Sequence, residues 1–134
     1  MKKAIIDTDI LSMFLRGDKK VESRVAEYLS YHANLSISIL TYYEILSGLR
    51  YKNAHKKLEI FLGLCESLSI IPLTIESSNK SAEIYASLRK GSEMIDDMDI
   101  LIAGICLENK FVLVTNNTKH FSRIKSIELA NWSD

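Results

Sequence analysis

The sequence has little of what marks the less ordinary classes of protein. It holds one proline and five glycines in 134 residues, which excludes a collagen-like chain and a Pro- and Gly-rich disordered one. Hydrophobic residues make up 47% of the chain and charged residues 25%, as in a globular domain. A chain of this length buries roughly two-thirds of its surface on folding, and we expect one domain over residues 1–134.

Cysteines and long apolar runs are also scarce. Cys65 and Cys106 lie in apolar stretches, and we expect buried, reduced thiols rather than a disulfide framework. No uncharged run reaches the roughly 20 residues that cross a bilayer. The apolar stretch that precedes Asp7 is too short for a signal peptide. These absences predict a soluble, cytoplasmic protein without a membrane partner.

The chain has no excess charge of either sign, because 17 basic residues balance 17 acidic ones. Nucleic-acid-binding domains are often basic, so this balance is a weak argument against such a partner. It does not exclude a nuclease, because metal-binding carboxylates offset surface Lys and Arg in the count. The three histidines and two cysteines have no zinc-site spacing, which excludes the common zinc modules.

Short apolar runs alternate with segments that carry apolar residues at helical spacing. The runs predict strands at 4–6, 35–38, 70–73, 111–114 and 127–129. The other segments predict helices at 9–15, 21–29, 39–51, 54–68, 75–89, 99–109 and 119–124. Pro72 marks the third strand as an edge strand. This alternation predicts an α/β fold with a parallel sheet covered on both faces.

Acidic residues stand at the carboxyl ends of strands, where such folds bind ligands. Asp7 follows the first strand, Glu44 lies one turn into the helix after the second, and Asp99 opens an apolar helix. Each has an ordinary alternative. Asp7 or Asp9 can cap the next helix, and Glu44 can be a surface residue. Asp99 can stabilise the helix dipole, or residues 96–97 can cap that helix.

The fourth strand ends at residues 115–117, Thr-Asn-Asn, which form either a turn or hydrogen-bonding groups in the same crevice. Three carboxylates at one site repel one another unless a cation compensates them. Because only oxygen ligands are available, the sequence predicts Mg²⁺, or Mn²⁺ in its place. Such a metal lowers the pKa of a bound water and stabilises a scissile phosphate, which is the chemistry of phosphodiester hydrolysis.

With these residues in view, the chain resembles the VapC-type toxins of the PIN-domain superfamily. The resemblance is carried by IIDTDIL at 5–11, SILTYYEILSG at 38–48, DILIA at 99–103 and VTNNTKHF at 114–121. These stretches occur in the family's order, and the closing residues 130–132 resemble the family's tail. The resemblance implies a three-layer α/β/α PIN-like fold. It also implies a Mg²⁺-dependent endoribonuclease that acts as the toxin of a type II toxin–antitoxin pair.

The resemblance also assigns the site. Asp7, Glu44 and Asp99 match the family's acidic residues, and Asp7 and Asp99 would be the direct metal ligands. Asn117 falls where many members carry Asp, and it is counted with the catalytic set. This neutral residue would weaken the binding of a second metal.

A second group of residues would support the catalytic set. These residues are Thr8, Asp9, Thr41 and Thr115. The family implies that Thr8 and Thr41 orient carboxylates by hydrogen bonds. Asp9, which is often Asn in relatives, adds a charge that offsets the neutral Asn117.

The family further implies a substrate and partners. Structured RNA such as a tRNA is expected, with initiator tRNA a candidate. Such RNA is held by stacking and phosphate contacts. The expected contacts are Lys119, His120 and Arg123, together with Arg50, Lys52 and Lys125, although exposed basic residues are usually only solvated surface. His120 stands where an acidic residue is common in the family. A small antitoxin is expected, with operator DNA met only through it. The apolar, aromatic residues within 40–51 also predict a homodimer.

Three alternatives stay open at this point. Residues 7–9 and 96–97 mimic the acidic motifs of haloacid-dehalogenase phosphatases. However, the later pair follows no apolar strand, and Leu11 stands where that family has Thr or Val. A non-catalytic PIN fold used only for binding is the second alternative, and the intact acidic residues argue against it. The third is a housekeeping RNA-processing enzyme.

Overall fold

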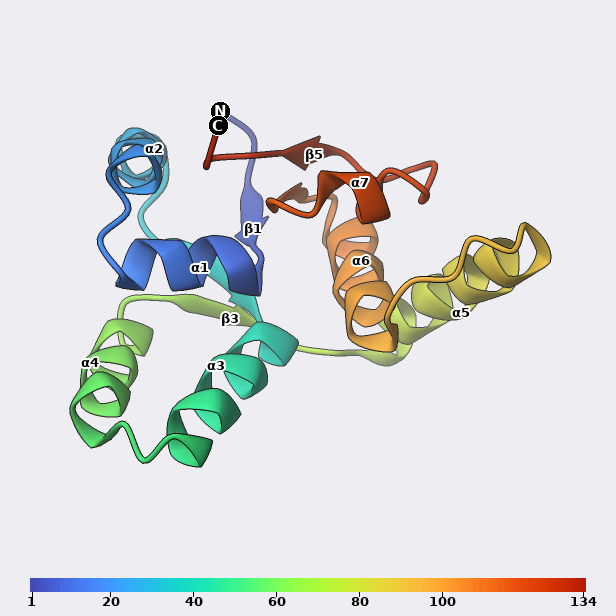
Figure 1. Ribbon diagram of the computed structural model, residues 1–134. Coiled ribbons are helices and arrows are strands. Elements are labelled where there is room, and N and C mark those ends of the chain that lie inside the picture. Colours follow the sequence, from blue (N-terminus) through green and yellow to red (C-terminus); the bar gives the residue numbers. More distant parts are fainter.

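Five strands and seven helices alternate in the computed structural model, which describes residues 1–134 (Figure 1). The strands are β1 (Ala4–Ile6), β2 (Ser36–Ser38), β3 (Ser69–Ile71), β4 (Val112–Val114) and β5 (Leu129–Ala130). The helices are α1 (Thr8–Leu15), α2 (Lys19–Leu29), α3 (Ile39–Tyr51), α4 (His55–Cys65), α5 (Ile75–Lys90), α6 (Asp97–Asn109) and α7 (Thr118–Phe121). Every expected element is present, with ends shifted by a few residues at most.

The five strands form one sheet in the order β3-β2-β1-β4-β5, and every neighbouring pair is parallel. The strand β3 lies at an edge, as Pro72 predicted. Because all strands run in one direction, their carboxyl ends meet at one edge of the sheet. The strand order reverses between β1 and β4, which is where α/β sheets open a ligand-binding crevice.

Side chains alternate between the two faces of the sheet and build two cores. Ile5 and Leu113 face a core formed with α5, α6 and α7. Ile6 and Val114 face the other core, formed with α1, α2, α3 and α4. Figure 1 shows α1–α4 on one side of the strands and α5–α6 on the other. The predicted three-layer α/β/α arrangement is therefore confirmed.

The start of α1 differs from one of the two expectations. Asp7, with extended backbone, is the N-cap and accepts a hydrogen bond from the Thr8 N–H, while Asp9 lies in the first turn. Asp9 is therefore not the cap. Asp7 is the single residue between the end of β1 at Ile6 and the start of α1 at Thr8.

The apolar residues of two helices do not all face the core. Leu29 of α2 and Leu62 of α4 are exposed. One residue turns a helix by about 100°. Leu29 therefore points away from the core that Tyr28 enters. Cys65 and Cys106 are free thiols, as expected, and Cys106 is the fully buried one.

The two longest elements of the second core, α5 and α6, cross at close range. Gly104 of α6 makes this possible, because a methyl group there would overlap the Ser81 hydroxyl and the Ser77 carbonyl of α5. Ser81 also donates a hydrogen bond to the Ile100 carbonyl at 3.0 Å. This packing fixes the first turn of α6, which carries Asp99. None of the helices is long and apolar enough to span a membrane.

Candidate active site

Asp7 lies at the centre of the crevice between the ends of β1 and β4. The Thr115 hydroxyl donates to Asp7 Oδ2 at 2.8 Å, and the Thr8 N–H donates to Oδ1 at 2.8 Å. The Asp7 residue is only 6% exposed. Both carboxylate oxygens are therefore held in place in a nearly dry environment.

Glu44 turns toward the same crevice from the second turn of α3. The Thr8 hydroxyl donates to Glu44 Oε1 at 2.7 Å and lies 3.0 Å from Thr41 Oγ1. Thr41 is fully buried, and its N–H is held by Ser38, the N-cap of α3. The two threonines thus connect the start of α1 to the start of α3 and orient the Glu44 side chain.

Asp9 is held by two main-chain donors. Ile10 N–H donates to Oδ1 at 2.7 Å, and Asn116 N–H donates to Oδ2 at 3.1 Å. The second bond ties α1 to the segment after β4. The sequence placed Asn116 among the hydrogen-bonding groups of this crevice, but its backbone N–H makes the contact, and a backbone N–H leaves no side-chain signal.

The pKa of Asp7 is raised to about 7, mainly by burial and then by the negative charge of Asp9. Hydrogen bonds from Thr115 and Thr8 oppose this rise. Burial also raises the pKa of Asp9. A group that must ionise in a dry crevice beside like charges needs a compensating cation.

Asp99 approaches from the first turn of α6, where it is half-buried. Its pKa is raised to about 6, first by burial and then by the charges of Asp96 and Glu44. His120 acts in the opposite direction. Asp96 is the N-cap of α6, and its influence was missed in the sequence, where it was considered only as a cap.

The acidic side chains fit a hard cation that keeps part of its water shell. The chain has two ion pairs, Lys2–Glu128 and Lys19–Glu22, so no Lys or Arg pairs with an acid of the crevice. No three His, Cys, Asp or Glu side chains lie together as a group that could hold a metal ion by themselves. Mg²⁺ is usually bound by one or two carboxylates and several waters, which these oxygen donors allow.

Asn117 connects the crevice to α7. Its backbone N–H donates to the Thr115 hydroxyl at 3.0 Å, and its Nδ2 lies 3.0 Å from His120 Nδ1. An amide nitrogen can only donate, so Nδ1 accepts and a neutral His120 carries its proton on Nε2. Asn117 thus presents His120 as a hydrogen-bond donor beside Asp99.

The expected RNA contacts Lys119, His120 and Arg123 lie in α7 and just after it rather than gathered in the crevice. Lys119 is exposed, and His120 borders the acidic side chains. Arg123 lies one turn further on and donates to the Met94 carbonyl at 3.1 Å. The structure therefore brings the seven other catalytic and supporting candidates around Asp7, with His120 beside them, and it places Lys119 and Arg123 outside the acidic cluster.

Comparisons with known proteins identify the family and the fold. The PIN domain family model matches residues 4–127. The chain is 33% identical to ribonuclease VapC1 of Rickettsia felis, with 96% of each chain covered. It is 24% identical to the tRNA(fMet)-specific endonuclease VapC of Shigella flexneri, covering 99% of this chain and 100% of that one. The crystal structure of VapBC2 from Rickettsia felis, bound to a promoter DNA fragment, matches with a TM-score of 0.83 at 26% identity. That match covers 96% of this chain and 98% of the other.

Proposed function

Because the chain belongs to the PIN-domain family and is a ribonuclease of the VapC type, we propose that it is a Mg²⁺-dependent endoribonuclease. In this proposal it cuts structured RNA and is the toxin of a toxin–antitoxin pair. One observation carries the proposal. Asp7 is buried, both its oxygens are held, and other acids surround it without a Lys or Arg partner. Family membership also removes the phosphatase interpretation.

Asp7 and Asp99 would hold the Mg²⁺ ion, and Mn²⁺ can take its place. When bound, the metal lowers the pKa of a coordinated water and stabilises charge on the scissile phosphate. Burial raises the pKa of both carboxyls, because a buried negative charge is unfavourable without a partner. A bound cation supplies the opposite charge and so stabilises the ionised carboxylates. The hydrogen bonds from the Thr115 hydroxyl and the Thr8 N–H would hold the Asp7 carboxylate in one orientation while it binds the metal.

The remaining residues orient the water and the RNA. Glu44 uses Oε1 to accept the Thr8 hydroxyl, which leaves Oε2 for the attacking water. His120 offers its Nε2–H to a phosphate oxygen while Asn117 holds Nδ1. Lys119 in α7 and Arg123 just after it would contact the neighbouring phosphates. Asp9, held by Asn116, adds negative charge that strengthens cation binding.

We infer that the substrate is a tRNA, with initiator tRNA a candidate. The Shigella flexneri relative, named for its specificity for tRNA(fMet), supports this choice and matches over its whole length. Incubating the purified chain with single tRNAs, in Mg²⁺, in Mn²⁺ and with a chelator, tests the proposal. We expect defined cuts that need the metal. Cleavage that persists in the chelator would refute the metal mechanism, and an absence of both metal binding and cleavage would favour a binding module.

We infer two protein partners. The solved VapBC2 complex supports a small cognate antitoxin, and its promoter DNA supports contact with operator DNA through that antitoxin. A homodimer is supported by Tyr43 and Tyr51 of α3, which are 61% and 89% exposed and so are not needed for the core. Sedimentation at micromolar concentration, with and without the product of the neighbouring gene, tests both. A monomer in each case would contradict the dimer.

A further inference from the structure

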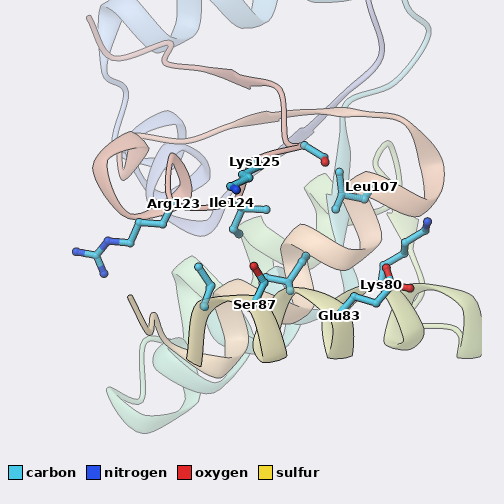
Figure 2. Close-up of a pocket in the computed structure, with 10 residues that line it drawn as sticks. Lys80, Glu83, Ser87, Leu107, Arg123, Ile124 and Lys125 are labelled. Atoms are coloured by element: carbon cyan, nitrogen blue, oxygen red, sulfur yellow. The ribbon is translucent and has the colours of Figure 1, made fainter. Parts of the chain in front are cut away.

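A cavity of about 240 Å³ lies between α5 and the segment that follows α7, and we call it the α5 groove (Figure 2). Its floor is apolar and consists of Ile84 and Leu88 from α5, Leu107 from α6, and Ile124. These four side chains belong to the second core or pack against it. The floor is therefore the outer surface of a rigid core rather than part of a mobile loop.

The rim of the α5 groove carries an excess of positive charge. Lys80, Arg123 and Lys125 line it together with a single carboxylate, Glu83. None of these four residues takes part in either ion pair of the chain. Figure 2 shows Arg123 and Lys80 at opposite ends, with Glu83 between them on α5. In a chain with zero net charge, this rim is a local site for an anion.

A short stretch of chain links the lining of the α5 groove to the acidic residues. His120 contacts Asn117 at 3.0 Å, and the Arg123 N–H donates to the His120 carbonyl at 3.2 Å, so one turn of chain joins the two sites. The Arg123 side chain also holds Met94, in the segment that leads into α6 and Asp99. A strand lying across Asp99 and His120 would therefore enter the groove at its Arg123 end.

We propose that the α5 groove binds the RNA strand that flanks the scissile bond. Lys80 and Lys125 contact phosphates, and the apolar floor takes a ribose or base. Single-stranded RNA is held in this way, by a positive groove that follows the backbone and an apolar surface beneath the bases. This inference rests on the proposed ribonuclease function, but it concerns a surface outside the acidic crevice. Lys80 and Lys125 would then favour longer RNA substrates by contacting phosphates away from the cut, without taking part in the cleavage step.

The test compares Lys80→Gln and Lys125→Gln with a matched control, Lys20→Gln. Lys20 is an exposed lysine of α2, on the opposite face of the sheet. We expect each groove variant to raise KM for a long RNA about fivefold, the upper range for one exposed charge pair, with kcat unchanged. The slope of log KM against log salt concentration should fall by roughly 0.7 for each lysine removed. Lys20→Gln should match the wild type in both.

Two further measurements separate the possible outcomes. Shortening the RNA on one side of the cut should abolish the difference between the wild type and the groove variants. Fluorescence anisotropy with labelled RNA, at low salt and without metal, reports binding even where nothing is cut. Equal KM, salt slope and anisotropy in all variants would overturn the α5 groove proposal alone. If the groove variants bind RNA as the wild type does but no longer self-associate, the groove instead binds a second copy of this chain, and the RNA proposal is wrong. A wild type that binds RNA through the groove but never cuts it would overturn the proposed function alone.

Discussion

Thr115 and Asp7 lie 108 positions apart in the chain and are joined by a buried hydrogen bond of 2.8 Å. The threonine hydroxyl donates to Oδ2 and accepts the N–H of Asn117 in turn. It therefore connects the end of β1 to the segment after β4 at the point where the strand order reverses. Among the causes that act on Asp7, this bond is the largest that lowers its pKa.

Replacing Thr115 tests that connection. Thr115→Val removes the donor and keeps the shape, so the pKa of Asp7 should rise above about 7. We expect at least about tenfold lower kcat near neutral pH, because a hydrogen bond to a charged group contributes roughly 1.5–3 kcal/mol. The acid limb of the pH–rate profile should move to higher pH, and Thr115→Ser should behave like the wild type. An unshifted profile in Thr115→Val would contradict this role.

Removing one charge from the crevice separates activity from stability. Asp7→Asn and Asp99→Asn should each abolish RNA cleavage while the fold survives. In metal-free buffer both should unfold at a higher temperature than the wild type, because repulsion and the cost of burying charge are relieved. Asp97→Asn, an exposed acid of the same helix turn, is the control and should retain activity. Wild-type cleavage by either crevice variant in Mg²⁺ would refute the site assignment.

The same carboxyls make stability depend on pH. The pKa of Asp7 is about 7 and that of Asp99 about 6 in the folded chain, against 3.8 for the free groups. Because the folded-state pKa is raised, the folded chain holds these protons more tightly than the unfolded chain does. The free energy of unfolding is therefore highest below about pH 4 and declines as the pH rises to about 7. Asp7 alone accounts for roughly 4 kcal/mol.

Urea unfolding with a chelator, followed from about pH 4 to about pH 8, measures this effect. Mg²⁺ should flatten the decline, because the ion binds the ionised folded state. Asp7→Asn should flatten it without metal. If the stability of Asp7→Asn falls with pH as steeply as that of the wild type, groups other than Asp7 cause the decline.

Replacing Asn117 with Asp adds a negative charge to the crevice, whereas the Asp→Asn variants remove one. Asn117→Asp adds a carboxylate beside the crevice, and the charge of a site tunes its cation affinity. We therefore expect half-maximal activity at a several-fold lower Mg²⁺ concentration. Asn117→Ala is the control, since it removes the His120 contact without adding charge. If both variants need as much Mg²⁺ as the wild type, Asn117 has no influence on the metal.

Gly104 and Gly63 form a matched pair for stability. A methyl group at Gly104 would overlap a hydroxyl and a main-chain carbonyl of α5, whereas one at Gly63 of α4 would meet no atom within 4 Å. Gly104→Ala should destabilise the fold by at least about 1–3 kcal/mol, the usual cost of overpacking. Gly63→Ala should stabilise it by about 1 kcal/mol through helix propensity. Thermal unfolding measures both, and equal shifts would show that α5 can move away from α6.

The sequence was most informative where a polar residue interrupts an apolar pattern. Asp7 and Asp99 stand out because each adjoins buried residues, and a parallel sheet brings strand ends together. Contacts made by the main chain left no such signal, as the Asn116 N–H on Asp9 illustrates. The α5 groove could not be predicted either. It depends on the path of α5 across Gly104, which is set by side-chain contacts rather than by periodicity.

The adjacency of β1 and β4 has a consequence for the order of events during synthesis. A chain is made from its amino end, so Asp7 emerges long before Thr115 and Asn117 exist. Until β4 is inserted beside β1, the first carboxylate has no partner for Oδ2, and the path through α7 into the groove is missing. A chain that ends before β4 therefore lacks the arrangement of Asp7, Thr115 and Asn117 on which the proposed cleavage depends.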